Sequence, residues 1–331
     1  MIARFSCGSP WSADSILMPN ELVSVIVPAY NARSTVVYAV RSALAQTWPE
    51  IEVVVVDDAS TDDTWDVLKS LDDPRIRLLR NQNNLGEGLT RNVAVAAARG
   101  EWVAMLDADD AWEARRLERL FDLARSRSGP LVLADNLMHC YSVADGLRPW
   151  KRHWEGTGPR FSGGAAVLDL ADYLRLPHLL LKPVILRRFL LEKRILHSAR
   201  AYAADTEFLI RVLKSGPRLL IAGEPLYLYR KTPGSASNNP RRATLMREMF
   251  VELLRELEFS EGERSAVQRR IAALEREERY VPFLFDLKTG HWVRALRRAA
   301  GEPWLIAELL RRLPQSAWYR LKVGIHRGST R

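Results

Sequence analysis

The sequence is poor in the residues that build disulfide frameworks and zinc sites. Its 331 residues include two cysteines, Cys7 and Cys140, which lie far apart and form no CxxC pair. The six histidines show no metal-ligand spacing. Neither a disulfide-stabilised domain nor a zinc site is therefore supported, and a reducing cytoplasm fits the cysteine content best.

Long apolar runs are also missing. No segment approaches the roughly 18 consecutive apolar residues that are needed to span a bilayer. The N-terminal segment lacks a basic start followed by a long apolar core, which a secretory signal would have. We therefore expect a protein that is neither secreted nor membrane-spanning. Met18 directly precedes the first strand-like segment, so residues 1–17 are assigned no function.

A chain-wide excess of positive charge is missing, although the formal net charge is +9. Between Leu287 and Arg331, ten Lys or Arg residues stand against two Glu, a local excess of +8. The rest of the chain is nearly neutral. A basic surface that tracks a phosphate backbone is therefore not indicated, and nucleic acid is not expected as a partner.

The sequence does contain a regular alternation of apolar runs and helical spacing. Strands are expected at residues 22–27, 51–56, 76–79 and 102–106, and helices at 34–46, 63–71 and 89–98. Near-continuous apolar strands separated by helices predict an α/β fold with a mostly parallel sheet buried on both faces. Such sheets bind ligands outside the carboxyl ends of their strands.

The pattern loosens after Asp110, which predicts a division of the chain. The expected parts are an N-terminal extension (1–20), a regular first half (21–110), a less regular second half (111–240) and a helical basic extension (241–331). In the second half we expect a helix at 114–127, strands at 131–134 and 218–221, a helix at 205–213 and a mobile loop at 231–240.

Carboxylates gather where the expected strands end. Asp57 and Asp58 follow the second strand, and Asp107, Asp109 and Asp110 follow the last one. Two carboxylate clusters at one edge of a sheet repel each other and lose hydration, so a cation should compensate them. Hard oxygen ligands select magnesium or manganese, which keep open positions for diphosphate oxygens.

A helix N-cap is the alternative explanation for an Asp after a strand. Asp62 or Asp63 fits that role, because a helix is expected to begin there. One helix needs only one such cap, however. A metal site therefore explains the cluster from Asp107 to Asp110 better than capping does.

Four ordered motifs carry a family resemblance. They are VSVIVPAYN (Val23–Asn31), VVVVDDAS (Val53–Ser60), NNLGEGLTRN (Asn83–Asn92) and LDADD (Leu106–Asp110). On these motifs the chain resembles glycosyltransferase family 2 over roughly residues 22–237. The resemblance implies the GT-A fold, a Rossmann-like sheet with flanking helices, here with a helical C-terminal extension. It also implies transfer of a sugar from a nucleotide donor with inversion at the anomeric carbon.

The resemblance assigns residues of the first half to the donor and its metal. The residues it assigns to the nucleotide are Pro28, Tyr30, Asp58, Arg91 and Asp107. Asp109 would ligate manganese or magnesium, with Asp107 and Asp110 beside it. Chemistry agrees in part, because a carboxylate such as Asp58 can accept a hydrogen bond from the uracil imide and Tyr30 offers a stacking face. Arg91 could instead simply cover the surface of its helix.

An inverting transfer in one step needs a carboxylate that deprotonates the acceptor hydroxyl opposite the leaving diphosphate. The segment Ala203–Leu209 resembles the Glu-Asp pair with which a helix of the family begins, and this makes Asp205 the base. Ala204 stands where Glu is usual, and Glu207 is the alternative base. An N-cap role for Asp205 is compatible with catalysis.

Four further residues are candidates for the acceptor side or a lid. They are Trp154, Lys182, Arg230 and Ser235. Arg230 and Ser235 lie in a segment that resembles the flexible loop of the family near the diphosphate, although a plain surface loop fits as well. Trp154 lies among Trp and Arg residues suited to stacking on sugar rings, to packing or to a protein interface. The run 179–185 predicts a core strand that carries Lys182 near the acceptor cleft.

The basic C-terminal segment has Trp and Leu at helical spacing with arginines between them. Basic amphipathic helices that contain tryptophan bind anionic bilayers, so the segment could hold the enzyme peripherally on the cytoplasmic face of the inner membrane. The alternative is a helical pair that packs on the catalytic domain. A polyprenyl-diphosphate-linked saccharide would be the acceptor at such a surface.

The expected activity is transfer of a hexose, with glucose from UDP-glucose as the first choice, in exopolysaccharide assembly of the succinoglycan kind. A sugar-nucleotide pyrophosphorylase would share the sheet and the metal carboxylates. It would want a Gly-rich triphosphate loop after the first strand, and residues 28–32 do not form one. A non-catalytic nucleotide-binding or nucleic-acid-binding protein is the other alternative, which binding without turnover would favour.

Overall fold

The computed structural model describes residues 21–125, 127, 131–143, 146–156, 158–231, 239 and 241–312. Contacts divide the chain into two compact units, Met1–Arg270 and Ile271–Arg331. The boundary falls inside the long helix α9 (Glu261–Lys288). The divisions expected at residues 110 and 240 stay predictions.

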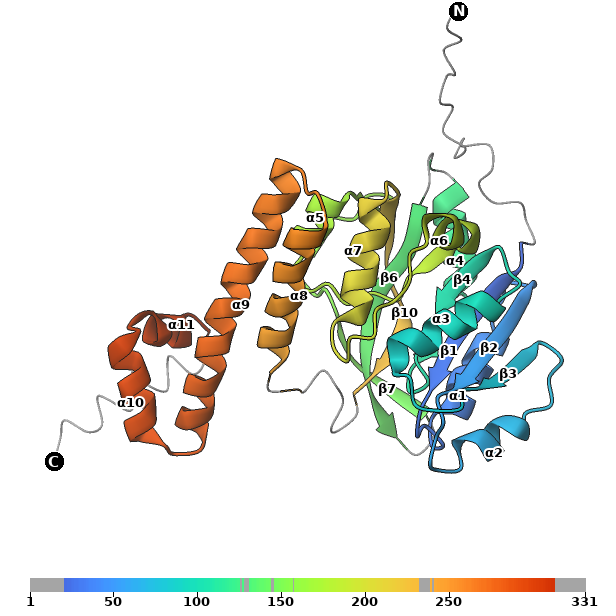
Figure 1. Ribbon diagram of the computed structural model, residues 1–331, viewed down its shortest axis with the longest axis horizontal. Helices are drawn as coiled ribbons and strands as arrows, with labels where there is room; N and C mark the ends of the chain where they lie inside the picture. Colours follow the sequence, from blue (N-terminus) through green and yellow to red (C-terminus); the bar gives the residue numbers. More distant parts are fainter. Residues whose placement is uncertain are drawn as a thin grey trace, which may run out of the picture. The chain divides into compact units, whose positions relative to one another are not determined.

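Within the described residues, unit 1 is built around a ten-stranded mixed sheet (Figure 1). Its strands are β1 (Val23–Ala29), β2 (Ile51–Asp57), β3 (Ile76–Arg80), β4 (Trp102–Met105), β5 (Ala111–Trp112), β6 (Leu131–Val143), β7 (Gly146–Arg152), β8 (Ala165–Leu168), β9 (Val184–Leu186) and β10 (Arg218–Arg230). They are ordered β3-β2-β1-β4-β9-β6-β10-β5, with β7 beside β6 and β8 beside β10.

The first half of the sheet is parallel, as the alternation of strands and helices predicted. β1 pairs with β2 on one side and β4 on the other, and β2 pairs with β3. Every residue of β1 and β2 is buried, which explains why both read as continuous Val- and Ile-rich runs. The chain first moves outward from β1 to β3 and then returns to β4 on the far side of β1. This reversal marks the carboxyl ends of β1 and β4 as the position at which open α/β sheets bind ligands.

Helices cover this sheet and continue into the second unit. They are α1 (Val36–Leu44), α2 (Thr64–Lys69), α3 (Glu87–Ala97), α4 (Arg116–Arg125), α5 (Leu170–Arg175), α6 (Arg187–Lys193), α7 (Ala204–Lys214), α8 (Arg242–Glu256), α9, α10 (Trp292–Gly301) and α11 (Trp304–Arg312). Both α1 and α3 pack on β1 and β2. Right-handed crossovers in opposite directions along the sheet put them on opposite faces.

The prediction of a strand at residues 179–185 was wrong in its length. Only β9 is regular there, and it runs antiparallel to β4 with Val184 opposite Ala104. Pro183 has no N–H to donate to a ladder, and its carbonyl accepts the Met105 N–H at 3.1 Å. Lys182 therefore lies outside the sheet, two residues before β9 begins. The strands expected at 131–134 and 218–221 are the starts of the much longer β6 and β10.

Unit 2 holds a small apolar core of its own, between the end of α9 and the two short helices that follow. The buried residues of this core are Tyr280, Phe283, Ala295, Ala299 and Leu305. In the part of the chain that the structure describes, no helix is both long enough and apolar enough to cross a membrane.

Candidate active site

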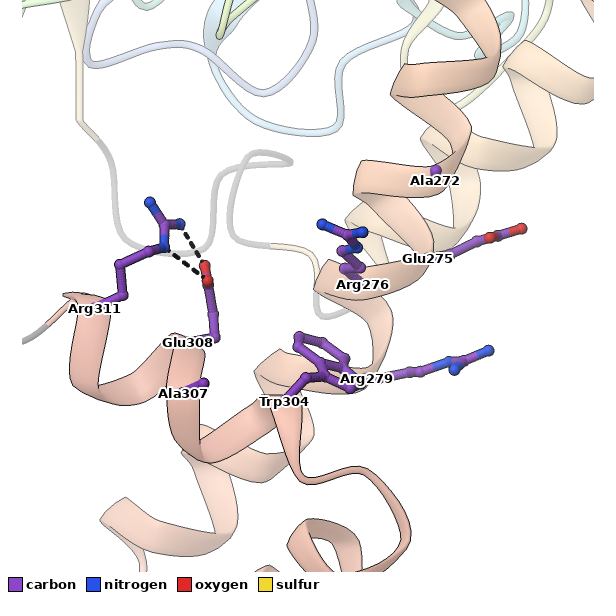
Figure 2. Close-up of a pocket in the computed structure, with 8 residues that line it drawn as sticks. All are labelled: Ala272, Glu275, Arg276, Arg279, Trp304, Ala307, Glu308 and Arg311. Carbon is purple, nitrogen blue, oxygen red and sulfur yellow. Dashed lines mark hydrogen bonds and ion pairs between the residues drawn. The ribbon is translucent and has the colours of Figure 1, made fainter.

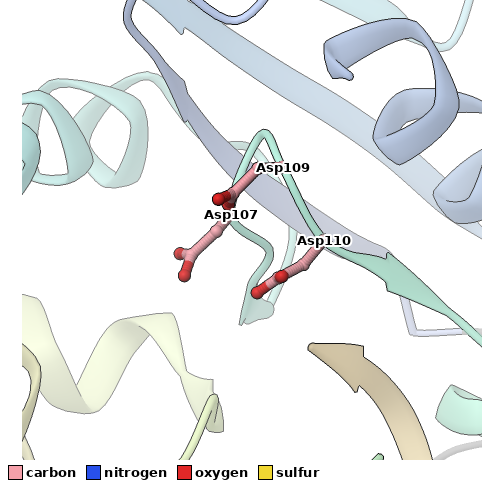
Figure 3. A group of neighbouring side chains, drawn as sticks. All are labelled: Asp107, Asp109 and Asp110. Atoms are coloured by element: carbon pink, nitrogen blue, oxygen red, sulfur yellow. The ribbon is translucent and has the colours of Figure 1, made fainter. Parts of the chain in front are cut away.

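The turn between β4 and β5 carries three aspartates, Asp107, Asp109 and Asp110. Each offers one carboxylate oxygen to a group in which the three oxygens lie within 4.8 Å of one another. Figure 3 shows the three side chains projecting from this turn. An all-oxygen donor set at this spacing fits magnesium or manganese, whose bonds to oxygen are about 2.0–2.2 Å, after a small adjustment of the side chains.

Asp110 fixes the turn to β10. One of its carboxylate oxygens accepts the backbone N–H of Arg230 at 2.7 Å, and the other accepts the hydroxyl of Tyr227 at 2.8 Å. The Tyr227 oxygen also accepts the backbone N–H of Asp107 at 3.1 Å. Burial, helped by the charges of Asp109 and Asp107, raises the pKa of Asp110 well above its ordinary value. Asp110 thus holds the β4–β5 turn against β10.

Asp109 is the most available carboxylate of the three. It is only partly buried, and no Lys, Arg or His of the described residues forms an ion pair with it. Burial and the neighbouring charge of Asp107 raise its pKa above the ordinary value for aspartate. A nearby cation would relieve both effects. The geometry therefore favours Asp109 over Asp110 as the principal metal ligand.

Two buried cations join this turn to the start of α7. Lys182 Nζ lies 2.5 Å from Asp107 Oδ2 and 2.6 Å from Asp205 Oδ2. Arg91 pairs with the other oxygen of each carboxylate, at 2.6 Å from Asp107, and also with Glu87. Buried cations are costly unless they are paired, and here each one has at least two carboxylate partners. The predicted metal turn and the predicted base therefore belong to one ionic cluster.

The same pairing sets the protonation of the predicted base. Burial by itself would raise the pKa of Asp205, but Arg91 and Lys182 outweigh it and bring this pKa well below the ordinary value. Burial would lower the pKa of Lys182, yet Asp107 and Asp205 raise it above its ordinary value. Asp205 is therefore ionised at neutral pH, as a general base must be. It stays a weak base while both cations touch it.

Arg116 supports Lys182 from inside the molecule. Its guanidinium donates to the Lys182 carbonyl at 2.7 Å, pairs with the buried Asp135 at 2.7 Å, and lies 4.5 Å from the centre of the Trp112 ring. Sequence reasoning missed Arg116, Asp135 and Tyr227. They belong to no recognised motif. Tyr227 is brought to the β4–β5 turn by the pairing of β10 with β5, and Asp135 by the pairing of β6 with β10.

The residues predicted to contact the nucleobase lie at the ends of β1 and β2. Pro28 is buried, whereas Tyr30 is 48% exposed. Asn31 has a positive φ of 48°, and its side-chain oxygen accepts the N–H of Thr61 at 2.9 Å. This contact ties the loop after β1 to the loop after β2, so that Tyr30 is presented from a fixed loop.

Asp58 already holds the loop that precedes α3. Its carboxylate accepts the Asn81 amide at 2.8 Å and the backbone N–H groups of Leu85 and Gly86, both at 2.9 Å. A carboxylate offers about four acceptor positions, so about one remains for a nucleobase. Contact with uracil stays a prediction, and the geometry adds a structural role that the sequence did not indicate.

The end of the third motif clamps the segment that leads into α7. The side chain of Asn92 donates to the His197 carbonyl at 2.8 Å and accepts the His197 N–H at 2.9 Å. A Cβ atom on Gly88 would overlap the carbonyl oxygen of Ser198. Gly88 and Asn92 therefore set how closely α3 approaches the segment that carries Asp205.

We predict that Gly88→Ala lowers turnover by at least ~10-fold, because small displacements of a reacting group are costly. The added methyl should push the segment at Ser198 away from α3 and displace Asp205 relative to the metal turn, while donor affinity changes little. Steady-state kinetics and nucleotide titration measure the two effects. Gly262→Ala is the matched control, since its methyl would meet no atom within 4 Å. Equal turnover in the two variants would contradict this account.

The alternative base, Glu207, is not supported by its surroundings. Its carboxylate accepts the Ser198 hydroxyl at 2.7 Å and pairs with Arg200 and Arg211, both at 2.9 Å. The side chain is nearly buried within these contacts. Glu207 therefore fastens α7 to its neighbours, while Asp205 faces the ionic cluster.

Two predicted acceptor or lid residues need correction. Trp154 is only 4% exposed, so its ring has no free face on which a sugar could stack. The exposed tryptophan of that stretch is Trp150, at 58%. Arg230 is no part of a free loop, because its Nε donates to the Asp109 carbonyl at 2.5 Å and its side chain is largely buried. Ser235 lies outside the described residues.

A separate groove of about 670 Å³ lies wholly within unit 2 (Figure 2). It is lined by Ala272, Glu275, Arg276, Arg279, Trp304, Ala307, Glu308 and Arg311. Two of its arginines are already paired, Arg311 with Glu308 at 2.6 Å and Arg279 with Glu302 at 3.3 Å. It contains none of the strand-end carboxylates, so we do not regard it as the active site.

Comparison with known proteins assigns the chain to a family. The model of "Glycosyl transferase family 2" matches residues 24–181. The succinoglycan biosynthesis protein ExoO of Rhizobium meliloti (strain 1021) is 30% identical over 292 residues, which cover 87% of this chain and 83% of ExoO. The chain belongs to glycosyltransferase family 2. It is therefore a glycosyltransferase, as the four motifs predicted.

Solved structures confirm the GT-A fold of this family 2 enzyme. The S. aureus protein TarS 1–349 in complex with UDP-GlcNAc has a TM-score of 0.57 and 24% identity, covering 76% of this chain and 71% of that one. The mannosyltransferase PcManGT from Pyrobaculum calidifontis, in complex with GDP-Man and Mn²⁺, has a TM-score of 0.59 and 20% identity, covering 96% and 84%.

A shorter match concerns an enzyme with a named substrate. The Escherichia coli protein WfaP is 46% identical over 92 residues, 28% of this chain and 37% of that relative. Its name describes a UDP-Glc:alpha-D-GlcNAc-diphosphoundecaprenol beta-1,3-glucosyltransferase. The aligned part is thus a minor share of both proteins.

Proposed function

We propose that this family 2 glycosyltransferase transfers glucose from UDP-glucose to a polyprenyl-diphosphate-linked saccharide in exopolysaccharide assembly. The names of ExoO and WfaP support this choice of pathway, donor and acceptor. The reaction would take place at the cytoplasmic face of the inner membrane, where a nucleotide sugar meets a lipid-linked acceptor.

The observation that carries the proposal is the link between Asp205 and the strand-end aspartates through Lys182 and Arg91. An inverting transfer needs a carboxylate base on one side of the anomeric carbon and charge neutralisation for the leaving diphosphate on the other. Asp205 supplies the first requirement. Asp109, with Asp107 beside it, would hold a divalent metal.

The residues of the site then have separate roles. A bound magnesium or manganese ion would neutralise the charge that develops on the departing UDP. Lys182 and Arg91 keep Asp205 ionised and hold it next to the donor site. Tyr30 offers an exposed ring to the uracil, and Asp58 has an acceptor position left for it.

Calorimetric titration of UDP, GDP and dTDP into the purified protein, with and without manganese, tests the donor assignment. We expect binding that requires the metal and favours UDP. Tight binding of GDP or dTDP in preference to UDP would overturn the donor, and absence of binding by all three would favour a non-catalytic protein. Turnover is then measured with UDP-glucose and, as a matched control, UDP-galactose, on a polyprenyl-diphosphate-linked sugar.

A further inference from the structure

The helix α10 of unit 2 presents large apolar side chains to solvent. Trp292, Val293 and Leu296 are 61%, 66% and 68% exposed. Leu296 follows Val293 by three residues and Trp292 by four, so it lies between them on one face of the helix. The small residues Ala295 and Ala299 face the core of unit 2 instead. The helix therefore packs through its alanines and leaves its tryptophan and leucine uncovered, the reverse of the usual arrangement.

A cation borders this apolar face. At 100° per residue Arg297 lies next to Val293, whereas Arg294 lies nearly opposite Leu296. Both arginines are exposed and form no ion pair among the residues that the structure describes. Arg298, on the same helix, pairs with Asp286 at 2.8 Å and so helps to fix α10 on α9. The stretch from Leu287 to Arg331 has a charge excess of +8 in the sequence. A partner that complements this apolar and basic surface must combine negative charge with an apolar interior.

We infer that this outer face of α10 docks the enzyme on an anionic phospholipid surface, with Trp292 and Leu296 inserted and Arg297 at the headgroups. Arg294, on the far side of the helix, adds only to the general positive charge. Tryptophan favours the boundary between headgroups and acyl chains, and each arginine near an anionic surface adds to the attraction. The inference rests on the proposed lipid-linked acceptor for its biological purpose. Binding to the surface itself needs no sugar.

Co-sedimentation of the full chain with vesicles tests the inference. We compare vesicles of phosphatidylcholine alone with vesicles that also contain phosphatidylglycerol. The protein should sediment mainly with the anionic vesicles, and added salt should weaken this binding. Trp292→Ala combined with Leu296→Ala should lower the partition coefficient by at least ~10-fold. Arg297→Gln should lower it about fivefold on anionic vesicles, and Arg294→Gln should lower it less, because Arg294 lies farther from the surface.

A matched control removes the same charge from unit 1. Arg125→Gln combined with Arg175→Gln changes two exposed arginines there and should leave the partition coefficient unchanged. Equal losses in this control and in the α10 variants would show an effect of total charge and overturn the inference. Wild-type protein that stays in the supernatant with both vesicle types would also overturn it.

Light scattering and nucleotide titration separate the remaining outcomes. If Trp292→Ala with Leu296→Ala turns an oligomer into a monomer and leaves vesicle binding intact, the face is a subunit interface and the inference fails. The α10 variants should bind UDP and manganese like the wild type. Loss of vesicle binding with intact UDP binding supports the docking surface, whereas a wild type that binds vesicles but no nucleotide contradicts only the proposed function.

Discussion

Asp109→Asn is expected to weaken metal-dependent UDP binding by at least ~10²-fold, because even groups that only orient metal ligands are worth 10–100-fold in affinity. The substitution keeps the shape of the side chain and removes the charge that has no cation partner among the described residues. Titration of UDP with and without manganese measures the loss. The weak binding that needs no metal should stay unchanged.

Asp172→Asn is the matched control. Asp172 is an exposed aspartate of α5 that pairs with Arg175, and it carries none of the site contacts described above. Its loss should not affect UDP binding. Metal-dependent binding of wild-type strength in Asp109→Asn would show that Asp107 and Asp110 suffice, and the assignment of Asp109 would be wrong.

The pH dependence of metal affinity gives a second test of Asp109. Burial and the charge of Asp107 raise its pKa, so protons compete with a metal at a higher pH than for an ordinary aspartate. Manganese affinity should therefore decline as pH falls through this raised pKa. Asp109→Asn should remove that part of the decline, since asparagine does not titrate.

Local patterns were enough to predict the framework of the site. The β-branched runs at Val23 and Val53 predicted parallel strands, and parallel strands have ligands at their carboxyl ends. The cluster from Asp107 to Asp110 followed from its place after such a strand. The choice of Asp205 over Glu207 as the general base could also be narrowed from helix geometry. At 100° per residue, Asp205 and Glu207 point to nearly opposite sides of a helix, so only one of them can face the cleft.

Contacts that depend on tertiary structure could not be predicted. Lys182 and Asp205 meet because the chain enters β9 and α7 in the same place, a fact that no local spacing encodes. Arg116 looked like an ordinary charge on a helix, yet it is buried against Asp135. Trp154 is buried and Trp150 exposed, although composition treats both tryptophans alike.

Asp205→Asn is expected to retain UDP and manganese binding while turnover falls by at least ~10²-fold, the usual contribution of a positioned general base. Asparagine still accepts a hydrogen bond from Lys182 but cannot take the proton of the acceptor hydroxyl. Comparing kcat with the UDP dissociation constant separates the two effects. Turnover like that of the wild type would remove Asp205 as the base.

Glu207→Gln provides the control on the same helix. It weakens the pairs with Arg200 and Arg211, so the protein should unfold at a lower temperature while each folded molecule keeps its turnover. A loss of turnover as large as that of Asp205→Asn would instead mean that any damage to α7 inactivates the enzyme. In that case the effect at Asp205 would carry no information about proton transfer.

The acidic limb of the rate profile distinguishes a base from a merely structural carboxylate. In kcat/KM this limb reports the pKa of the free enzyme. Arg91 and Lys182 outweigh burial and lower the pKa of Asp205, so, with manganese kept saturating, the limb that belongs to Asp205 should lie below the ordinary aspartate range. The loss of metal affinity at Asp109 occurs at higher pH and is separated from it in this way. Lys182→Met removes one of the two cations and should move the limb toward higher pH. A limb that stays in place would mean that Asp205 does not titrate in the reaction.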